Sequence, residues 1–218
     1  ERAVEYAYQT RTKFPDRRIL LVGEIIHNPH VNARLREMGI DILTPSASGF
    51  DYSVISPQDV VILPAFGVPI RDFQTLRECG CVMVDTTCGS VLNVWKRVEA
   101  YARDGLTSLI HGKHYHEETR ATASQAEKYP GSQWIVVRDM AEARIVCDYI
   151  EGRGDRASFL AKFAPAVSEG FDPDLHLRRI GVANQTTMLA RESLAIGEEV
   201  GRAIGRARGA DARATDFR

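Results

Sequence analysis

The amino-acid sequence predicts an α/β fold with mostly parallel sheets. Short runs rich in Val and Ile alternate with helical patterns almost throughout the chain, which is typical of βα units. These runs are apolar along their whole length, as strands covered on both faces usually are. We find no short repeat and no low-complexity tract that would indicate a different architecture.

Six strands are predicted from these apolar runs, and they could form one sheet or two small ones. They cover residues 19–22, 59–63, 82–85, 107–110, 134–137 and 180–183. Residues 165–174, which contain Gly170, Phe171, Asp172 and Pro173, indicate a loop insertion before the last strand.

Helices are predicted between the strands, where apolar residues recur at helical spacing. The clearest covers residues 90–102, with Val91, Val94, Trp95, Val98 and Ala102 on one face. The others cover residues 32–38, 70–78, 117–128, 140–149 and 190–204, with Gly39 and Gly105 as C-terminal stops.

The two ends of the sequence lack the usual signals of complete elements. Residues 1–8 already follow a helical pattern, but no initiator Met or capping residue precedes them. After residue 204, a segment from Gly205 to Gly209 ends the last helix, and no closing element is apparent. We therefore expect the chain to be a fragment.

Composition excludes several classes of partner. The 218 residues are 44% hydrophobic and 26% charged, which is typical of a soluble globular protein. A net charge of −1 gives no excess of positive charge for binding nucleic acid. No apolar run reaches the roughly 20 residues of a membrane span. Four cysteines in a chain of this length indicate a reducing compartment, and Cys79-Gly80-Cys81 lacks the spacing of common zinc or redox pairs.

Cys88 is the most informative single residue. It follows an apolar strand and precedes the helix over residues 90–102. The N-H groups and the dipole at a helix N-terminus favour the thiolate, which is the form that binds metal or attacks. The alternative is a small buried hydrophobic residue, and position alone does not decide between the two.

Polar side chains, and Phe66 after the second strand, also follow the other predicted strands. Because ligands of parallel sheets bind beyond the carboxyl ends of the strands, these side chains could line one pocket. For His27 the alternative is a turn that satisfies the backbone, and for Thr186 and Thr187 it is a helix cap. The residues are Glu24, His27 and Asn28; Phe66; Thr86, Thr87 and Cys88; His111, Lys113, His114, His116 and Glu118; and Asn184, Gln185, Thr186 and Thr187.

The histidine-rich segment could hold zinc or an anion. His111, His114 and His116 lack the i, i+4 spacing of a helical zinc pair, so we favour an anion site. Imidazole donors near a helix start, with Lys113, would hold phosphate oxygens. Glu118 would then share a proton and act as an acid, unless it lies solvated on the helix face.

Taken together, these segments resemble the 4-hydroxy-3-methylbut-2-enyl diphosphate reductase family, most closely its plant and cyanobacterial branch. The resemblance covers nearly the whole chain, and the residues that carry it keep their order and spacing. They are Glu24-Ile25-Ile26-His27-Asn28-Pro29, Val60-Val61-Ile62-Leu63-Pro64-Ala65-Phe66-Gly67, Asp85-Thr86-Thr87-Cys88, Ile110-His111-Gly112-Lys113, His116-Glu117-Glu118-Thr119 and Ala183-Asn184-Gln185-Thr186-Thr187-Met188-Leu189.

The resemblance implies three similar parallel-sheet α/β domains in a trefoil-like arrangement, of which this chain would hold two. Residues 1–90 would be the first domain, 91–205 the second, and 206–218 the start of the connection to a third. It also implies a 4Fe-4S cluster held by three cysteines, one from each domain. Cys88 would be the ligand from this chain, and the other two would lie outside it.

The resemblance further implies the reductive removal of a hydroxyl from 4-hydroxy-3-methylbut-2-enyl diphosphate to give isopentenyl and dimethylallyl diphosphate, the last step of the methylerythritol phosphate route. Glu118 and Thr186 would be catalytic, and His27, Asn28, His116, Gln185 and Thr186 would bind the allylic diphosphate. A ferredoxin- or flavodoxin-type donor would supply electrons, in a bacterial cytoplasm or a plastid stroma. The fragment alone would be inactive.

Two positions depart from the family pattern. Phe66 replaces a phosphate-binding histidine of many bacterial members, and Gly89-Ser90 replaces a proline-aromatic pair after the cysteine, which should loosen the helix start. Two other functions remain open at this point. One is a diphosphate-binding module without a cluster, and the other is a zinc hydrolase built on His111, His114, His116 and Cys88.

Overall fold

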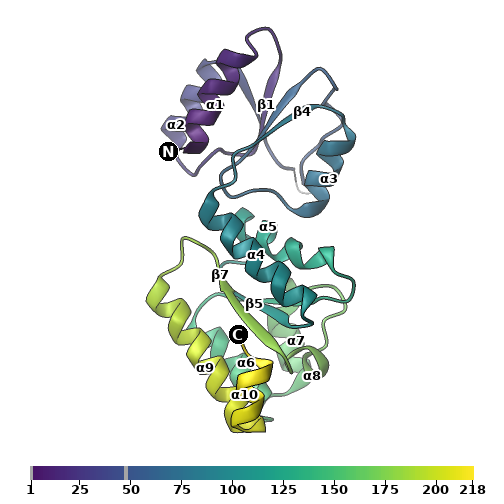
Figure 1. The fold of residues 1–218 in the computed structure, drawn as a ribbon, viewed down its shortest axis with the longest axis vertical. Helices are drawn as coiled ribbons and strands as arrows, with labels where there is room; N and C mark the ends of the chain where they lie inside the picture. The colour runs from purple at the N-terminus through teal and green to yellow at the C-terminus, as the bar shows by residue number, and fades with distance from the viewer. Residues whose placement is uncertain (1, 47–48) are drawn as a thin grey trace. The chain divides into compact units, whose positions relative to one another are not determined.

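A computed structural model describes residues 2–46 and 49–218, and the predicted helical residue Glu1 lies outside this range. The chain divides into two compact units. Unit 1 extends to Leu92, and unit 2 runs from Asn93 to Arg218 (Figure 1). Both are α/β with parallel sheets, so the predicted fold class is confirmed. No helix in the described part of the chain is both long enough and apolar enough to cross a membrane.

Unit 1 contains a parallel sheet of four strands in the order β2-β1-β3-β4. The strands are β1 (Ile19–Val22), β2 (Ile40–Leu43), β3 (Val60–Leu63) and β4 (Val82–Asp85). The helices are α1 (Arg2–Lys13), α2 (Pro29–Glu37) and α3 (Ile70–Glu78), while α4 (Gly89–Arg103) begins in unit 1 and continues in unit 2.

Alternate residues of these strands enter two separate apolar layers. Leu21 and Ile62 pack with Ala7 of α1 and Leu35 of α2, whereas Leu20 and its neighbours on the other face pack with Leu76 of α3. Figure 1 shows α3 on the opposite side of the sheet from α1 and α2. All residues of β1 and β3 are buried, as expected for strands covered on both faces.

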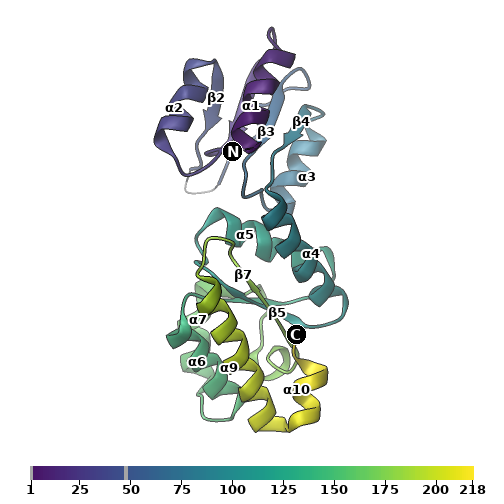
Figure 2. The same cartoon turned by 60° about the vertical axis from the view of Figure 1, so that its left-hand side comes forward.

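Unit 2 contains a parallel sheet of three strands in the order β6-β5-β7. The strands are β5 (Thr107–His111), β6 (Trp134–Val137) and β7 (Ile180–Asn184). The helices are α5 (Glu117–Ser124), η1 (Gln125–Lys128), α6 (Met140–Ile150), α7 (Arg156–Phe163), η2 (Ala164–Ala166), α8 (Pro173–His176), α9 (Ala190–Arg208) and α10 (Ala210–Asp216). Figures 1 and 2 both show α6 and α9 side by side.

The last residues of the chain pack tightly against unit 2. Arg218 forms backbone hydrogen bonds with Ile180 and Val182, at 3.1 and 2.8 Å, along the outer edge of β7. The Phe217 ring lies so close to Gly201 of α9 that a Cβ there would be 2.9 Å from it. Paired edges are protected from other strands, so this segment completes the sheet of unit 2.

The structure corrects several predicted elements. β2 was missed because Asp41 interrupts its short apolar run at the sheet edge. The last helix continues through Gly205 to Arg208, and α10 then follows, so Gly205 is not a stop. The predicted loop over residues 165–174 is flanked by helical segments that the sequence did not indicate: α7, η2 and α8. The predicted helix over residues 117–128 changes to 3₁₀ geometry at Gln125.

Candidate functional site

In unit 1, the loop that follows β1 is held by a buried asparagine. Asn32 is 1% exposed, and its amide accepts a hydrogen bond from Ile25 N-H at 3.2 Å and donates one to the Ile26 carbonyl at 2.9 Å. Asn28 caps α2, since its side-chain oxygen accepts from the N-H groups of His30 and Val31. The Asn28 side-chain oxygen is thus used to cap the helix. Its amide nitrogen is the atom that remains for the predicted contact with the substrate.

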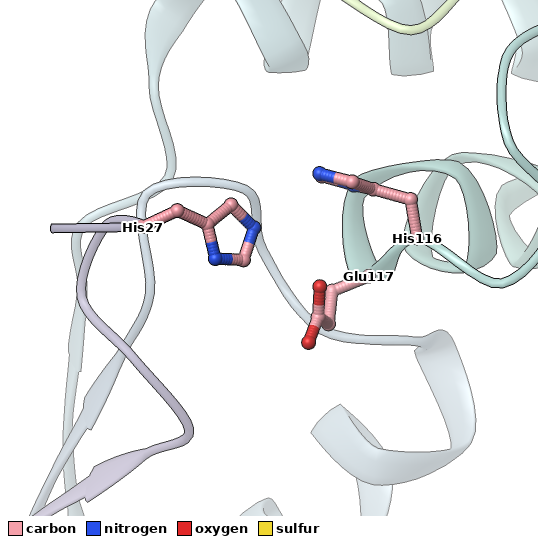
Figure 3. Close-up of side chains that lie close together, drawn as sticks. All are labelled: His27, His116 and Glu117. Atoms are coloured by element: carbon pink, nitrogen blue, oxygen red, sulfur yellow. The ribbon is translucent and has the colours of Figure 1, made fainter. Parts of the chain in front are cut away.

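His27 lies exposed on the same loop (Figure 3), and contacts with Phe66 and Glu24 orient its ring. The ring stacks on Phe66, with centroids 4.8 Å apart and an interplanar angle of 14°. Its Nδ1 lies 3.1 Å from Glu24 Oε2, which leaves Nε2 on the opposite edge of the ring. Phe66 is 8% exposed and follows β3, so it provides a fixed surface for this imidazole.

Cys88 is exposed at the end of β4, immediately before α4. Its N-H donates to the Ala65 carbonyl at 2.7 Å, and its carbonyl accepts from Leu92 N-H at 3.0 Å. Asp85 accepts from the N-H and hydroxyl of Thr87, and the buried Thr86 hydroxyl donates to Leu63 of β3. The backbone before the thiol is therefore fixed, while the thiol itself remains accessible.

The other cysteines are poorer candidates for a metal ligand. Burial raises the pKa of the Cys147 thiol to about 12, with smaller contributions from Glu199 and Glu151. Burial also raises the pKa of Cys81, whose thiol donates to the Leu76 carbonyl. Because metals bind the thiolate, Cys81 and Cys147 are poor ligands, whereas Cys88 is exposed. Within residues 2–46 and 49–218, no group of three or more nearby metal-ligand atoms contains it.

In unit 2, Glu118 and Thr186 form a close pair at the ends of neighbouring strands. Glu118 is 3% exposed in the first turn of α5, after β5, and Thr186 follows β7. The Glu118 carboxylate accepts from Thr186 N-H at one oxygen and from the Thr186 hydroxyl, at 2.9 Å, at the other. The two residues predicted to be catalytic are thus in direct contact, and Glu118 is not on a solvated helix face.

His116 is the N-cap residue of α5, next to the exposed Glu117 (Figure 3). Its Nδ1 accepts a hydrogen bond from Glu118 N-H at 3.1 Å. An accepting Nδ1 carries no hydrogen, so the hydrogen of the neutral ring lies on Nε2. The cap therefore defines the tautomer of His116 and aligns an N-H donor at a helix N-terminus, where anions bind favourably.

Gln185 joins the two loops that carry this pair. It is 2% exposed, and its side-chain oxygen accepts from Lys113 N-H at 3.1 Å and from the Thr119 hydroxyl at 3.0 Å, while its amide nitrogen donates to Thr187 Oγ1 at 2.6 Å. Gly112 allows this packing, because a Cβ there would lie 2.8 Å from Thr119 Oγ1. The Gln185 amide therefore positions the loops.

His111 is fully buried beneath the same edge. Its Nδ1 lies 2.8 Å from Ser193 Oγ, and its Nε2 has no hydrogen-bond partner among the described residues. Burial lowers the pKa of His111 against the opposing influence of Glu192, 4.0 Å away. No group of three or more metal-ligand atoms in the described ranges includes His111, His114 or Cys88.

Three residues that hold the site were not identified from the sequence. Asn32 was read as a helix start, Thr119 as part of a helix, and Phe66 as a lost phosphate contact. Their roles depend on tertiary contacts with Ile25, Gln185 and His27. Of the three, only Phe66 could have been noticed in the sequence, because it is an apolar residue at a strand end where the other strands are followed by polar residues.

With the geometry of both strand edges described, comparison with known proteins identifies the family. A family model described as LytB protein matches residues 1–213. The chain belongs to the LytB family. The predicted family resemblance is confirmed.

Similar curated proteins carry the name 4-hydroxy-3-methylbut-2-enyl diphosphate reductase. One from Thermosynechococcus vestitus is 54% identical over 199 residues, covering 91% of this chain and 48% of that protein. A chloroplastic one from Botryococcus braunii is 52% identical and is covered to 39% of its length. The chain thus spans about half the length, or less, of the curated relatives it matches.

Two solved structures resemble the fold of the chain. One is of (E)-4-hydroxy-3-methyl-but-2-enyl diphosphate reductase, the terminal enzyme of the non-mevalonate pathway, with a TM-score of 0.65, 23% identity, and coverage of 92% of this chain and 58% of that one. The other is of the reductase from Plasmodium falciparum, with a TM-score of 0.65, 18% identity and coverage of 92% and 52%. At these identities, the likeness establishes the fold.

Proposed function

We propose that the protein containing this chain removes the hydroxyl of 4-hydroxy-3-methylbut-2-enyl diphosphate by reduction, giving isopentenyl and dimethylallyl diphosphate. The names of relatives about half identical to the chain support this proposal. The observation that carries it in the structure is the contact between Glu118 and Thr186, a buried carboxylate against a hydroxyl at the carboxyl ends of two parallel strands.

Glu118 and Thr186 supply the proton in this proposal. Loss of a hydroxyl requires protonation of the leaving oxygen, so that water departs. The Thr186 hydroxyl hydrogen-bonds near that oxygen, and Glu118 passes a proton through it. The hydrogen bond from Thr186 N-H holds the carboxylate in place, which favours transfer along one path.

The two histidines bind the diphosphate. His116 offers its Nε2-H at the start of α5, where the helix dipole favours an anion. His27 is held by Phe66 and Glu24 with Nε2 on its far edge, and the amide nitrogen of Asn28 is close in sequence. Hydrogen bonds between the Gln185 side chain and Lys113, Thr119 and Thr187 hold the loop of His116 against the loop of Thr186.

Cys88 is the ligand that this chain contributes to a 4Fe-4S cluster. The accessible thiol and the fixed backbone before it fit that role. When bound, a cluster with an open iron supplies electrons and Lewis acidity for removal of the hydroxyl. Because the chain spans about half of its relatives, the other cysteine ligands are assigned to the rest of the protein, and the 218 residues alone are expected to be inactive.

Two further features belong to the proposal. A ferredoxin- or flavodoxin-type protein donates the electrons, since the proposed reaction consumes electrons that no group of this chain supplies. The protein works in a bacterial cytoplasm or a plastid stroma, as the bacterial and chloroplastic relatives suggest.

Glu118→Gln in the whole protein tests the proton transfer. Gln keeps the shape and can still accept from Thr186 N-H, but it cannot deliver a proton as a carboxylic acid. We expect turnover to fall by about 100-fold or more, with iron content and substrate affinity unchanged. The matched control is Glu198→Gln, which makes the same change at an exposed glutamate of α9 and should keep turnover within about threefold of the parent.

Turnover kinetics, iron analysis and the visible absorbance of protein purified without oxygen give the readouts. Unchanged turnover in Glu118→Gln would remove Glu118 from the proton path. A colourless parent protein that contains no iron but binds inorganic pyrophosphate would instead support a diphosphate-binding module without a cluster.

A further inference from the structure

A polar cavity lies in unit 2, at the amino ends of the strands. It has a volume of about 290 Å³. Thr107 is the first residue of β5, Gln133 precedes β6 and Arg179 precedes β7, and all three line it. Since the three strands are parallel, this cavity is at the opposite edge of the sheet from Glu118 and Thr186. It is therefore distinct from the candidate active site.

Hydrogen-bond donors dominate the polar lining of this cavity. Thr107 is only 5% exposed, and its hydroxyl has no hydrogen-bond partner within the described ranges. Gln133 accepts from the Ser168 hydroxyl with its side-chain oxygen, so its amide nitrogen, for which the described residues offer no acceptor, remains to donate. Donors in a partly enclosed cavity are favourable only when an acceptor satisfies them.

His176 adds a donor of defined orientation. Its Nδ1 accepts from Asp172 N-H at 2.8 Å, so the hydrogen of the neutral ring is on Nε2. Its ring also packs against Phe171, with centroids 5.5 Å apart, which limits its rotation. The imidazole is thus oriented before any ligand arrives.

Two arginines give the cavity a positive charge. Arg178 uses Nε to donate to the Asp174 carbonyl, and its two terminal nitrogens make no hydrogen bond to described residues. Arg179 donates to the Asp104 carbonyl and lies 3.8 Å from Asp216. In the part of the chain that the structure describes, no Asp or Glu lines the cavity. A terminal Arg fork with no carboxylate opposite it suits a phosphate oxygen pair.

The rest of the lining is apolar. Leu106 and Ala102 are buried, and Leu175 is 59% exposed. A free inorganic ion would leave this surface without a partner, whereas a phosphate attached to a short hydrocarbon or ring would cover it. We propose that this cavity binds a small organic phosphate, with Arg178, His176, Gln133 and Thr107 as donors to the phosphate oxygens. The site is separate from, and independent of, the proposed reductase chemistry.

The proposal is tested by calorimetric titration of the whole protein with phenyl phosphate, a small organic phosphate whose ring can cover the apolar lining. His116→Asn serves as the background, because it weakens the diphosphate contact of the proposed active site. We expect a binding event to remain in this background. Arg178→Gln should weaken that remaining event by about tenfold or more, since a charge-assisted hydrogen bond is lost.

Two further variants keep the result specific. Thr107→Val keeps the size and branching of the residue and should weaken the same event by about fivefold through loss of the hydroxyl. Arg202→Gln removes the same charge from an arginine of α9 that pairs with Glu199 outside the cavity, and it should change nothing.

Three results would overturn the proposal. The first is no binding of phenyl phosphate in the His116→Asn background. The second is an equal loss in Arg202→Gln and Arg178→Gln, which would indicate a general charge effect. The third is binding of succinate but not of phenyl phosphate, which would show that the donors select a carboxylate.

Discussion

In unit 1, two residues that follow the strands, His27 and Cys88, are exposed, whereas in unit 2 Glu118 and Gln185 are buried in a hydrogen-bonded network. His27 and Cys88 are exposed, and the buried Asn32 and Thr86 hold the backbone near them. At the edge of unit 2, Glu118 and Gln185 are 3% and 2% exposed.

This difference separates two ways of building a site. In unit 1, one set of side chains stabilises the loops and another set remains accessible. In unit 2, the same side chains do both, since His116 caps α5 and Glu118 bonds Thr186. Substitutions at the edge of unit 1 should therefore affect chemistry with little loss of stability, and substitutions in unit 2 should affect both.

The largest expected effect on stability is that of Gln185→Leu. Leucine would leave the Lys113 N-H, the Thr119 hydroxyl and the Thr187 hydroxyl without their present partner. We expect the free energy of unfolding to fall by about 3 kcal/mol. Asn28→Ala, which removes only the cap of α2, should cost about 1 kcal/mol.

Chemical denaturation of the whole protein and of both variants measures this contrast. Equal losses for Gln185→Leu and Asn28→Ala would contradict it, because the edge of unit 2 would then be no more interdependent than the edge of unit 1. Unchanged stability of Gln185→Leu would show that the loops do not need the amide.

The sequence predicted the sheets well, because most strands are continuous apolar runs. It missed β2, where Asp41 breaks the run, and it ended the last helix at Gly205. Glycine weakens a helix by only about 1 kcal/mol, and the packing of Val200, Ala203 and Ile204 against the core outweighs that loss.

The parts of the candidate site that could be predicted are the residues that directly follow a strand. Glu118 and Thr186 were expected at neighbouring strand ends, and the structure places them in contact. The supporting contacts were not predictable, since stacking of His27 on Phe66 and the bonds of Gln185 join residues far apart in the sequence. Local spacing carries no information about such pairs.

The pH dependence of stability gives a smaller effect that also distinguishes the units. Burial lowers the pKa of His111 in the folded chain, with Glu192 and Asp139 acting in the opposite direction. The unfolded chain therefore binds more protons at acidic pH, and the free energy of unfolding should fall as the pH drops below the ordinary histidine pKa of about 6.5. Above that pH, His111 should not make the free energy of unfolding depend on pH.

Unfolding measured between pH 8 and pH 5 checks this expectation. His111→Asn keeps an acceptor or donor near Ser193 and should reduce the slope below about pH 6.5. Asn28→Ala removes the helix cap in unit 1 without changing a titratable side chain and serves as the control, with the parent slope retained. An unaltered slope in His111→Asn would assign the acid sensitivity to other groups.

The smallest effect, and the one of opposite sign, is expected for Gly89→Ala beside Cys88. Gly89 begins α4 without a left-handed backbone, and within the described residues a Cβ there meets no atom closer than 4 Å. Alanine should therefore raise the free energy of unfolding by about 0.5 kcal/mol, through reduced freedom of the unfolded chain. Gly112→Ala should instead destabilise unit 2, because its Cβ would lie 2.8 Å from Thr119 Oγ1. Denaturation of both variants decides the point, and a loss of stability in Gly89→Ala would mean that the helix start beside Cys88 is as constrained as the buried edge of unit 2.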